Sequence, residues 1–345
     1  MNIMKSAKPK LTVALLTYNR AHFLKYAIDG ILNQTYKDFE LMILDNASTD
    51  KTEEVVRGFA DPRIIYIKHR RNVGAANLNI ALRLNKSPYF IISHDDDIMK
   101  PNLLEKEVEI LDNNENVVMV SSNIDTIDIN NGIISNNLFL LDQDVVYKKN
   151  EYIKDFCQGR NLIACPTVML RMDFINKNKL FFKWKKVGPV SDVFFWFEVN
   201  LHDKYIYITK DSLYLYRVHE NQDSVKNVID MHISFYKCVE PFFIANGLQE
   251  MILKFKNMLF GLILSIIILK YHKGFIRAKQ RNIELAKLKA AHLWGKDILA
   301  KWRFKLFLVR LPLFISKSSL FFWGIARKLK GFKLKKFDKI KQIKA

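Results

Sequence analysis

Four short apolar stretches alternate with stretches of helical periodicity in the first hundred residues, and this alternation restricts the possible fold more than any other feature. The apolar stretches are rich in strand-forming residues and cover residues 11–16, 39–44, 64–67 and 89–92. Uninterrupted apolar runs of this length are typical of strands buried on both faces. Between the first two, apolar residues recur at helical spacing over residues 23–34. The pattern predicts an α/β protein with a parallel sheet flanked by helices.

A polar cluster follows each of the four predicted strands. In chain order the clusters are Thr17, Tyr18, Asn19 and Arg20; Asp45; Arg71 and Asn72; and Asp95, Asp96 and Asp97. In open parallel sheets, ligands bind at the carboxyl ends of the strands, so we expect these clusters to form one site. The alternative is that Asn19 and Asn72 are plain turn residues and that Asp45 only ends a strand.

Three adjacent carboxylates, Asp95, Asp96 and Asp97, form the last of these clusters. Like charges side by side repel one another and destabilise a fold that holds them near an apolar strand end. A bound divalent cation removes the repulsion, and hard oxygen ligands suit Mn²⁺ or Mg²⁺. A solvated acidic turn is the alternative, but the clusters at the other three strand ends favour the cation.

Two common nucleotide-binding classes and one class of metal site are disfavoured. No GxGxxG motif or P-loop follows the first predicted strand, which argues against a dinucleotide-dependent dehydrogenase and a P-loop NTPase. Cys157, Cys165 and Cys238 form no CxxC pair, and their number is odd. This pattern indicates a reducing compartment and argues against a disulfide framework or a zinc site.

The charge distribution divides the chain of 345 residues into a near-neutral body and a basic tail. Residues 251–345 contain 24 Lys/Arg and 3 Asp/Glu, whereas the first 250 residues contain 31 and 32. With Gly247 as a helix breaker, this shift predicts a body of residues 1–245 and a tail of residues 246–345. The body is long enough for a large core, and we expect it to consist of two halves that meet at about residue 110.

The basic tail combines apolar and cationic residues. Residues 257–269 form an apolar run that is too short to span a bilayer comfortably, and later aromatic and leucine residues alternate with Lys and Arg. This composition favours an amphipathic helix on an anionic membrane surface, at the inner face of the plasma membrane. A nucleic-acid-binding tail and a solvated helical appendage are the alternatives. The high apolar content disfavours nucleic acid.

In the order and spacing of its motifs, the sequence resembles the family 2 glycosyltransferases, which have the GT-A fold. The resemblance is strongest over residues 10–110 and continues more weakly to about residue 225. The matching stretches are residues 13–20 (VALLTYNR), 31–40 (ILNQTYKDFE), 44–50 (LDNASTD), 71–74 (RNVG) and 93–97 (SHDDD).

The resemblance implies an inverting, metal-dependent transfer of a sugar from a nucleotide-diphosphate sugar, expected to be UDP-linked. The acceptor would be a hydroxyl group of a glycan or of a lipid-linked saccharide. Asp45 would accept a hydrogen bond from a base edge such as the N3–H of uracil. The residues expected around the nucleoside and its phosphates are Thr17, Tyr18, Asn19, Arg20, Arg71, Asn72 and Asp95.

The acidic triplet departs from the usual family pattern, Asp-x-Asp-Asp. Aligned on Ile98 and Pro101, the first aspartate of that pattern is His94 in this chain, and its role is left open. Asp96 then occupies the metal-binding position, with Asp97 beside it. A later segment that resembles the family's Arg-x-His motif adds His219 as a third candidate metal ligand, although a histidine in a loop often has no such role.

An inverting transfer also needs a base that deprotonates the acceptor hydroxyl. Asp192, at the start of a predicted helix after the turn at Gly188, is our candidate. An ordinary helix-capping aspartate is the alternative explanation for its position. Glu198 is the alternative base, but it lies six residues further into the helix.

Two other functions remain open from the sequence. A nucleotidyltransferase on a related α/β scaffold would need a loop rich in glycine and lysine after the first strand, and residues 17–20 do not provide one. A non-catalytic protein could keep the fold and use the tail to bind a membrane or nucleic acid.

Overall fold

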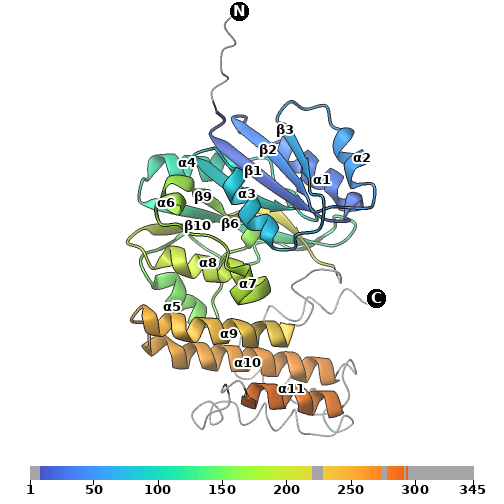
Figure 1. The fold of residues 1–345 in the computed structure, drawn as a ribbon. Coiled ribbons are helices and arrows are strands. Elements are labelled where there is room, and N and C mark those ends of the chain that lie inside the picture. Colours follow the sequence, from blue (N-terminus) through green and yellow to red (C-terminus); the bar gives the residue numbers. More distant parts are fainter. Residues whose placement is uncertain (1–7, 220–227, 273–277, 291–292, 294–345) are drawn as a thin grey trace, which may run out of the picture. The chain divides into compact units, whose positions relative to one another are not determined.

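The computed structural model of the 345-residue chain describes residues 8–219, 228–272, 278–290 and 293 (Figure 1). The chain divides into two compact units, one of residues 1–153 with 161–223 and the other of residues 154–160 with 224–345. The boundary predicted near residue 245 stays a prediction. Residues 294–345, which make up the second half of the predicted basic tail, lie outside the described residues.

The first unit is built on a mixed sheet whose strands run in the order β3-β2-β1-β4-β9-β6-β10-β5. The four predicted strands are confirmed as β1 (Leu11–Thr17), β2 (Phe39–Asp45), β3 (Ile64–Lys68) and β4 (Tyr89–His94). All pairings among these four are parallel, so their carboxyl ends lie at one edge.

The second half of this unit extends the same sheet. Its strands are β5 (Ile98–Met99), β6 (Val117–Ile127), β7 (Ile133–Ser135), β8 (Val145–Tyr147), β9 (Met169–Arg171) and β10 (Tyr205–Arg217). The long strands β6 and β10 pair in parallel, and β9 runs antiparallel between β4 and β6. The short β5 pairs antiparallel with β10, with Met99 opposite Tyr214. This pairing holds the end of β10 next to the turn that contains the acidic triplet.

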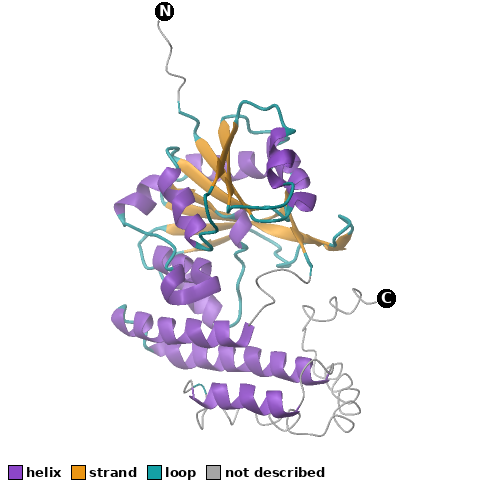
Figure 2. Cartoon of the chain, turned by 45° about the vertical axis from the view of Figure 1, so that its right-hand side comes forward, coloured by secondary structure: helices purple, strands orange, loops and turns teal. Residues whose placement is uncertain are grey.

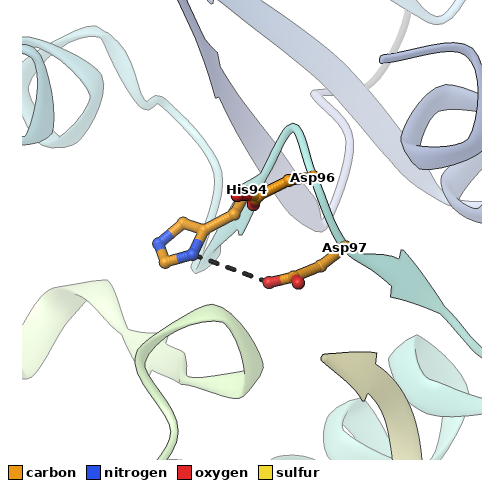
Figure 3. A group of neighbouring side chains, drawn as sticks. All are labelled: His94, Asp96 and Asp97. Carbon is orange, nitrogen blue, oxygen red and sulfur yellow. Dashed lines mark ion pairs between the residues drawn. The ribbon is translucent and has the colours of Figure 1, made fainter. Parts of the chain in front are cut away.

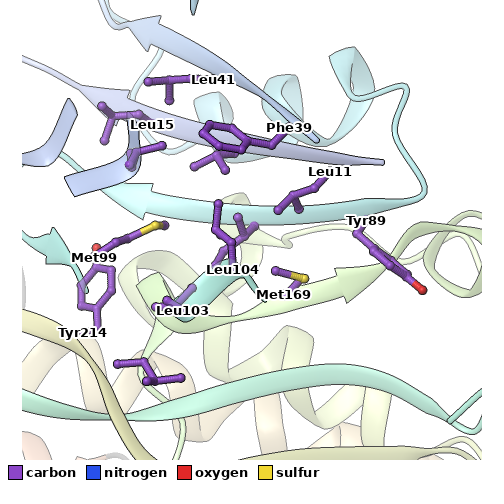
Figure 4. Close-up of a cluster of buried hydrophobic side chains, with 14 of the residues drawn as sticks. Leu11, Leu15, Phe39, Leu41, Tyr89, Met99, Leu103, Leu104, Met169 and Tyr214 are labelled. Carbon is purple, nitrogen blue, oxygen red and sulfur yellow. The ribbon is translucent and has the colours of Figure 1, made fainter. Parts of the chain in front are cut away.

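Helices cover both faces of the parallel strands (Figure 2). The helices of the first unit are α1 (Ala21–Leu32), α2 (Thr52–Arg57), α3 (Ala76–Leu84), α4 (Leu103–Asn113), α5 (Glu151–Cys157), α6 (Met172–Lys177), α7 (Trp184–Val187) and α8 (Ser191–Asn200). The last four residues of α5 belong to the second unit. Short 3₁₀ turns lie at Cys165–Thr167 and Gly188–Val190. Alternate strand residues such as Leu11 and Leu15 pack with α1 and α4 in the main core (Figure 4). Full burial of each such leucine contributes about 1.5–3 kcal/mol.

Gly30 in α1 allows the helix to lie directly against β5. A Cβ atom at this position would lie 3.0 Å from Cγ2 of Ile98 and 3.1 Å from the carbonyl oxygen of Met99. Because β5 follows the acidic triplet immediately, a side chain at residue 30 would push against the strand that holds the triplet in place.

Besides residues 154–160, the second unit contains the helices α9 (Val228–Ala245), α10 (Glu250–His272) and α11 (Ala278–Ala290) in its described part. Helix α10 packs against both α9 and α11. It is longer than the uninterrupted apolar run in the sequence, because it continues through Lys254 and Lys256. In the described chain it alone has the length and apolar composition to cross a membrane, over residues 250–268. A buried core helix has the same properties, and side chains such as Phe255, Ile263 and Ile267 are fully buried.

Glu107 in α4 is an unusual member of the core. Its side chain is fully buried, and neither carboxylate oxygen accepts a hydrogen bond from the described residues. Burial raises its pKa well above 4.5. The folded protein therefore keeps a proton on Glu107 at pH values where the unfolded chain has lost it, so the free energy of unfolding falls as pH rises above about 4.5.

Replacement of Glu107 by glutamine should remove this pH dependence. At pH 8 we expect Glu107→Gln to be more stable than the wild type by at least about 1 kcal/mol, because glutamine is neutral without the proton that the folded wild type must retain, and each unit of pKa difference corresponds to about 1.4 kcal/mol. Urea unfolding followed by circular dichroism between pH 5 and pH 8 measures the difference. The matched control is Glu109→Gln in the same helix, whose side chain is 60% exposed. Equal pH slopes in Glu107→Gln and the wild type would contradict the assignment.

Candidate active site

The acidic triplet lies in the turn between β4 and β5. Asp95, Asp96 and Asp97 expose only 3%, 5% and 1% of their surface. They therefore do not form the solvated acidic turn that the sequence left open. Buried carboxylates without partners destabilise a fold by several kcal/mol each, so the surrounding residues must supply compensating hydrogen bonds and positive charge.

Part of the compensation comes from the residues that follow β1. The Nη1 group of Arg20 donates to Oδ1 of Asp95 at 3.0 Å and to Oδ2 of Asp96 at 2.7 Å. The backbone N–H of Tyr18 donates to Oδ2 of Asp95 at 3.1 Å. The polar clusters predicted after the first and fourth strands are therefore in direct contact.

Further hydrogen bonds to the triplet come from the end of β10 and the residues that follow it. The backbone N–H of Arg217 donates to Oδ1 of Asp97 at 2.7 Å, and its Nε donates to the carbonyl oxygen of Asp96 at 2.6 Å. Nε2 of His219 lies 2.9 Å from Oδ2 of Asp96. Arg217 was not among the predicted site residues. The sequence feature that could have identified Arg217 is its position two residues before His219, in the Arg-x-His segment.

His94, Asp96 and Asp97 form a group that could hold a cation (Figure 3). Each offers one ligand atom, and these atoms lie within 4.8 Å of one another. Oδ2 of Asp97 is buried, accepts no hydrogen bond from the described residues, and lies 3.7 Å from Nδ1 of His94. Carboxylate oxygens suit Mg²⁺, Ca²⁺ and Mn²⁺, whereas an imidazole nitrogen suits transition-metal cations. The predicted set contained His219 in place of His94, and ligation by His219 stays a prediction.

The pKa values in this group follow from burial and from the mutual charges. Burial raises the pKa of Asp97 to about 6, against the opposing effect of its contact with His94. Burial would also raise the pKa of Asp96, but His94, Arg20 and His219 outweigh it and lower that pKa. Burial lowers the pKa of His94, but its interactions with Asp97 and Cys165 raise it more. The group therefore combines positive and negative charge in a site with little solvent.

Side-chain hydrogen bonds join the loops after β1, β2 and β3. Asn19 has a positive φ of 52°, and its backbone N–H donates to Oγ of Ser48 at 2.9 Å. The backbone N–H of Val73 donates to Oδ1 of Asn46 at 2.7 Å. Asn46 and Ser48 were not among the predicted site residues, although both lie in the matching stretch of residues 44–50.

Asp45 is fully buried at the end of β2. Its Oδ1 accepts from the backbone N–H of Ser48 at 2.8 Å, and its Oδ2 accepts from the hydroxyl of Tyr66 at 2.6 Å. Both oxygens are therefore engaged within the protein, and a hydrogen bond to a nucleotide base would have to share one of them. Its role as a base-binding residue stays a prediction.

The other residues that were predicted to bind the nucleotide sugar also lie at this edge of the sheet. Thr17 is buried at the end of β1. Oδ1 of Asn72 accepts from the backbone N–H of Gly74 at 2.7 Å, as in a turn. Arg71 is exposed and makes no hydrogen bond or ion pair with a described residue, so its guanidinium group is available to an anionic ligand.

Asp192 reaches the same site from the other half of the unit. It lies in the first turn of α8, after the turn at Gly188, which has a φ of 76°. Burial raises its pKa, and the positive charge of His94 partly opposes this rise. The charge of Asp192 in turn raises the pKa of Cys165, which also interacts with His94. Asp192 and Cys165 are therefore both close enough to His94 to interact with it electrostatically, and Cys165 was not among the predicted site residues.

Glu198, the alternative base, forms an ion pair with Lys183. Burial raises the pKa of Glu198, and Lys183 and Lys186 lower it. The negative charge of Glu198 is therefore compensated locally, whereas Asp192 is the carboxylate of α8 that interacts with His94.

Comparison with known proteins gives consistent matches. Residues 12–179 match the family model described as glycosyl transferase family 2. An uncharacterized glycosyltransferase of Methanocaldococcus jannaschii is 32% identical over 222 residues, which is 63% of this chain and 73% of that protein. The UDP-Glc:alpha-D-GlcNAc-diphosphoundecaprenol beta-1,3-glucosyltransferase WfgD of Escherichia coli is 30% identical over 167 residues, or 48% of this chain and 62% of WfgD.

Two solved structures share the fold at low sequence identity. S. aureus TarS 1–349 in complex with UDP superimposes with a TM-score of 0.63 and 16% identity, covering 87% of each chain. The mannosyltransferase PcManGT of Pyrobaculum calidifontis, in complex with GDP-Man and Mn²⁺, gives a TM-score of 0.51 and 15% identity, covering 92% of this chain and 88% of the other.

His94 should contribute directly to cation binding. We expect His94→Ala to weaken Mn²⁺ binding about tenfold or more, because one of three clustered ligand atoms is lost. Titration of Mn²⁺ followed by electron paramagnetic resonance measures free and bound metal without requiring activity. His202→Ala, at a half-buried histidine outside the group, is the matched control. Unchanged Mn²⁺ affinity in His94→Ala would show that His94 only shapes the turn.

Proposed function

The chain belongs to glycosyl transferase family 2, and on this premise we propose that it is a metal-dependent, inverting glycosyltransferase. It transfers a sugar from a UDP-linked donor to a hydroxyl group of a glycan or lipid-linked acceptor in the synthesis of a surface polysaccharide or glycolipid. Membership in the family decides against the nucleotidyltransferase and the non-catalytic protein that the sequence left open. The observation that carries the proposal is the group formed by the half-buried His94 and the buried Asp96 and Asp97, with Asp192 close enough to interact electrostatically with the histidine.

Known relatives support the choice of donor and acceptor. TarS has been solved with UDP and with UDP-GlcNAc, and PcManGT with GDP-Man and Mn²⁺. WfgD is named for a UDP-glucose donor and a diphosphoundecaprenol-linked acceptor. These names favour a nucleotide-diphosphate donor, a divalent cation and a lipid-linked acceptor for this chain.

The donor binds along the edge where the loops after β1, β2 and β3 meet. Arg71 contacts the phosphates from the rim, because its exposed guanidinium group carries a charge that no described residue neutralises. Asp96 and Asp97, with His94 or His219, would hold the cation, which would supply positive charge near the departing diphosphate. Arg20 donates hydrogen bonds to the carboxylates of Asp95 and Asp96 and so restricts their orientation.

Asp192 acts on the acceptor. It takes the proton from the acceptor hydroxyl as that oxygen forms a bond to the anomeric carbon. The bond between the anomeric carbon and the diphosphate oxygen breaks on the opposite face, so the configuration inverts and the nucleoside diphosphate leaves with the bonding electrons. The burial that raises the pKa of Asp192 also makes its carboxylate a stronger base.

The assignment of Asp192 predicts a loss of turnover without a loss of donor binding. We expect Asp192→Asn to lower kcat for sugar transfer by about 10²–10⁴-fold, the usual contribution of a general base. The assay screens nucleotide sugars in the presence of Mn²⁺ and measures the release of the nucleoside diphosphate. The affinity of Asp192→Asn for UDP should stay within about twofold of the wild-type value. Asp203→Asn, at an exposed aspartate after α8, is the control. Full transferase activity in Asp192→Asn would refute the assignment.

The basic tail attaches the enzyme peripherally to an anionic membrane, in our proposal at the cytoplasmic face of the plasma membrane. Residues 294–345, which lie outside the described structure, contain 15 Lys/Arg and 2 Asp/Glu among many aromatic and aliphatic residues. Each basic residue near an anionic surface contributes about 1 kcal/mol of attraction. A lipid-linked acceptor would be available at the same surface.

Removal of residues 294–345 should therefore release the protein from anionic vesicles. Cosedimentation with phosphatidylserine-containing vesicles is expected to fall at least about tenfold, while binding of UDP to the remaining chain is retained. Neutral phosphatidylcholine vesicles should bind both forms weakly. If the shortened chain sediments with anionic vesicles as well as the full chain does, the part of the tail after residue 293 is not the membrane anchor.

A further inference from the structure

Asn79, in the middle of α3, makes two hydrogen bonds to one residue far away in the chain. Its Oδ1 accepts from the backbone N–H of Phe182 at 2.9 Å, and its Nδ2 donates to the carbonyl oxygen of the same residue at 2.8 Å. The two residues are 103 positions apart in the sequence. One amide side chain thus satisfies both backbone groups of Phe182, which restricts the position and the orientation of that residue together.

The helix that carries Asn79 is itself anchored at the carboxyl edge of the parallel strands. Nδ2 of Asn77 donates to the carbonyl oxygen of Leu44, near the end of β2, at 3.3 Å. Oδ1 of Asn77 lies 2.7 Å from Nε2 of His69, directly after β3. Helix α3 is therefore fixed to the edge where the donor is proposed to bind.

Phe182 packs against the helix that carries Asp192. Its fully buried ring stacks on that of Phe195, with centroids 4.6 Å apart and an angle of 17° between the planes. It also meets the ring of Trp196 edge to face, at 6.1 Å. Residues three and four positions apart lie on the same side of a helix, so Phe182 supports α8 one turn beyond Asp192 on the side that carries Asp192.

The beginning of α8 has few other directional contacts that could fix it. Its N-cap residue is Val190, whose apolar side chain cannot cap a helix. Gly188 precedes it with a φ of 76°, and no described atom lies within 4 Å of the position that a Cβ would take there. Lys183 pairs with Glu198, but Glu198 lies near the far end of the helix. The two hydrogen bonds of Asn79 therefore fix the chain just before this loosely packed turn.

We propose that Asn79 is a positioning residue for Asp192 and holds the start of α8 in place relative to the donor. This inference rests on the proposed function. A general base must lie within hydrogen-bond reach of the acceptor hydroxyl, on the side of the anomeric carbon opposite the diphosphate. The loops after β1, β2 and β3 determine where the donor lies, so the base has to be placed relative to the same loops. Asn79 supplies that connection, because α3 is bound to the ends of β2 and β3 and Phe182 is bound to α3.

Loss of the Asn79 side chain should impair turnover and spare donor binding. We expect Asn79→Ala to lower kcat for sugar transfer or donor hydrolysis about tenfold to a hundredfold, because a catalytic group displaced by about 1 Å can cost that much. The full-length protein is assayed with UDP-glucose and UDP-GlcNAc in Mn²⁺, and its affinity for UDP should stay within about twofold of the wild-type value.

The matched control is Asn85→Ala at the other end of α3. Oδ1 of Asn85 accepts from the backbone N–H of Ser87 at 3.1 Å, and its Nδ2 donates to the carbonyl oxygen of Ser87 at 3.0 Å. Asn85→Ala thus removes the same pair of hydrogen bonds from the same helix, but these bonds reach only two residues along the chain. We expect its kcat to stay within about twofold of the wild-type value.

A double variant and hydrogen exchange distinguish positioning from a general loss of stability. Because Asn79 acts through Asp192, Asn79→Ala/Asp192→Asn should turn over within about twofold of Asp192→Asn alone. Hydrogen exchange of the full-length protein, followed by mass spectrometry, should be faster over residues 182–199 in Asn79→Ala than in Asn85→Ala. The exchange measurement requires no turnover.

The outcomes separate the inference from the proposed function. Equal kcat in Asn79→Ala and Asn85→Ala, or losses that add in the double variant, would overturn the inference and leave the glycosyltransferase standing. Unchanged exchange over residues 182–199 in Asn79→Ala would overturn it as well. Failure of the wild type to bind UDP would instead count against the proposed function, and the inference would fall with it.

Discussion

Arg217, the last residue of β10, joins that strand to the acidic triplet, and the site depends on this connection. The residue is fully buried, and besides its bonds to Asp96 and Asp97 its guanidinium group donates to the carbonyl oxygen of Asp128 and to Oδ1 of Asn131. Its guanidinium carbon also lies 4.6 Å from the ring centroid of Phe23. Because Arg217 is positively charged and buried, it offsets part of the free-energy cost of burying three carboxylates. The buried arginine or the buried carboxylates without the other would destabilise the fold.

The chain path explains how such distant residues meet. β4 carries the triplet to the carboxyl edge of the parallel strands, and the two-residue strand β5 then pairs with β10. That register places Arg217 and His219 over the triplet, while α1 approaches β5 closely at Gly30. Asp192 arrives from α8, so the charges that stabilise the turn and the carboxylate proposed to act on the acceptor come from separate parts of one unit. The electrostatic balance of the site is therefore a property of the tertiary fold.

Much of this could be predicted from local sequence patterns, and the rest could not. Apolar runs and helical spacing predicted β1 to β4 and α1, and the rule for strand ends predicted that Arg20 and Asp95 would meet. No local pattern identifies a two-residue strand such as β5, so the contacts of Arg217 were not foreseen. His94 was noticed only as a departure from a motif, and its place beside Asp97 depends on the shape of the turn. The hydrogen bonds that Tyr66 and Ser48 make to Asp45 are equally invisible without coordinates.

The central claim is that the buried triplet and its neighbours form a metal-dependent site for a nucleoside diphosphate. Calorimetric titration of the full-length protein with UDP, in Mn²⁺ and again in excess EDTA, tests it most directly. We expect binding in Mn²⁺ that weakens at least about tenfold in EDTA and is lost in Asp96→Ala. Equal UDP affinity with and without the metal, or no UDP binding under either condition, would contradict it.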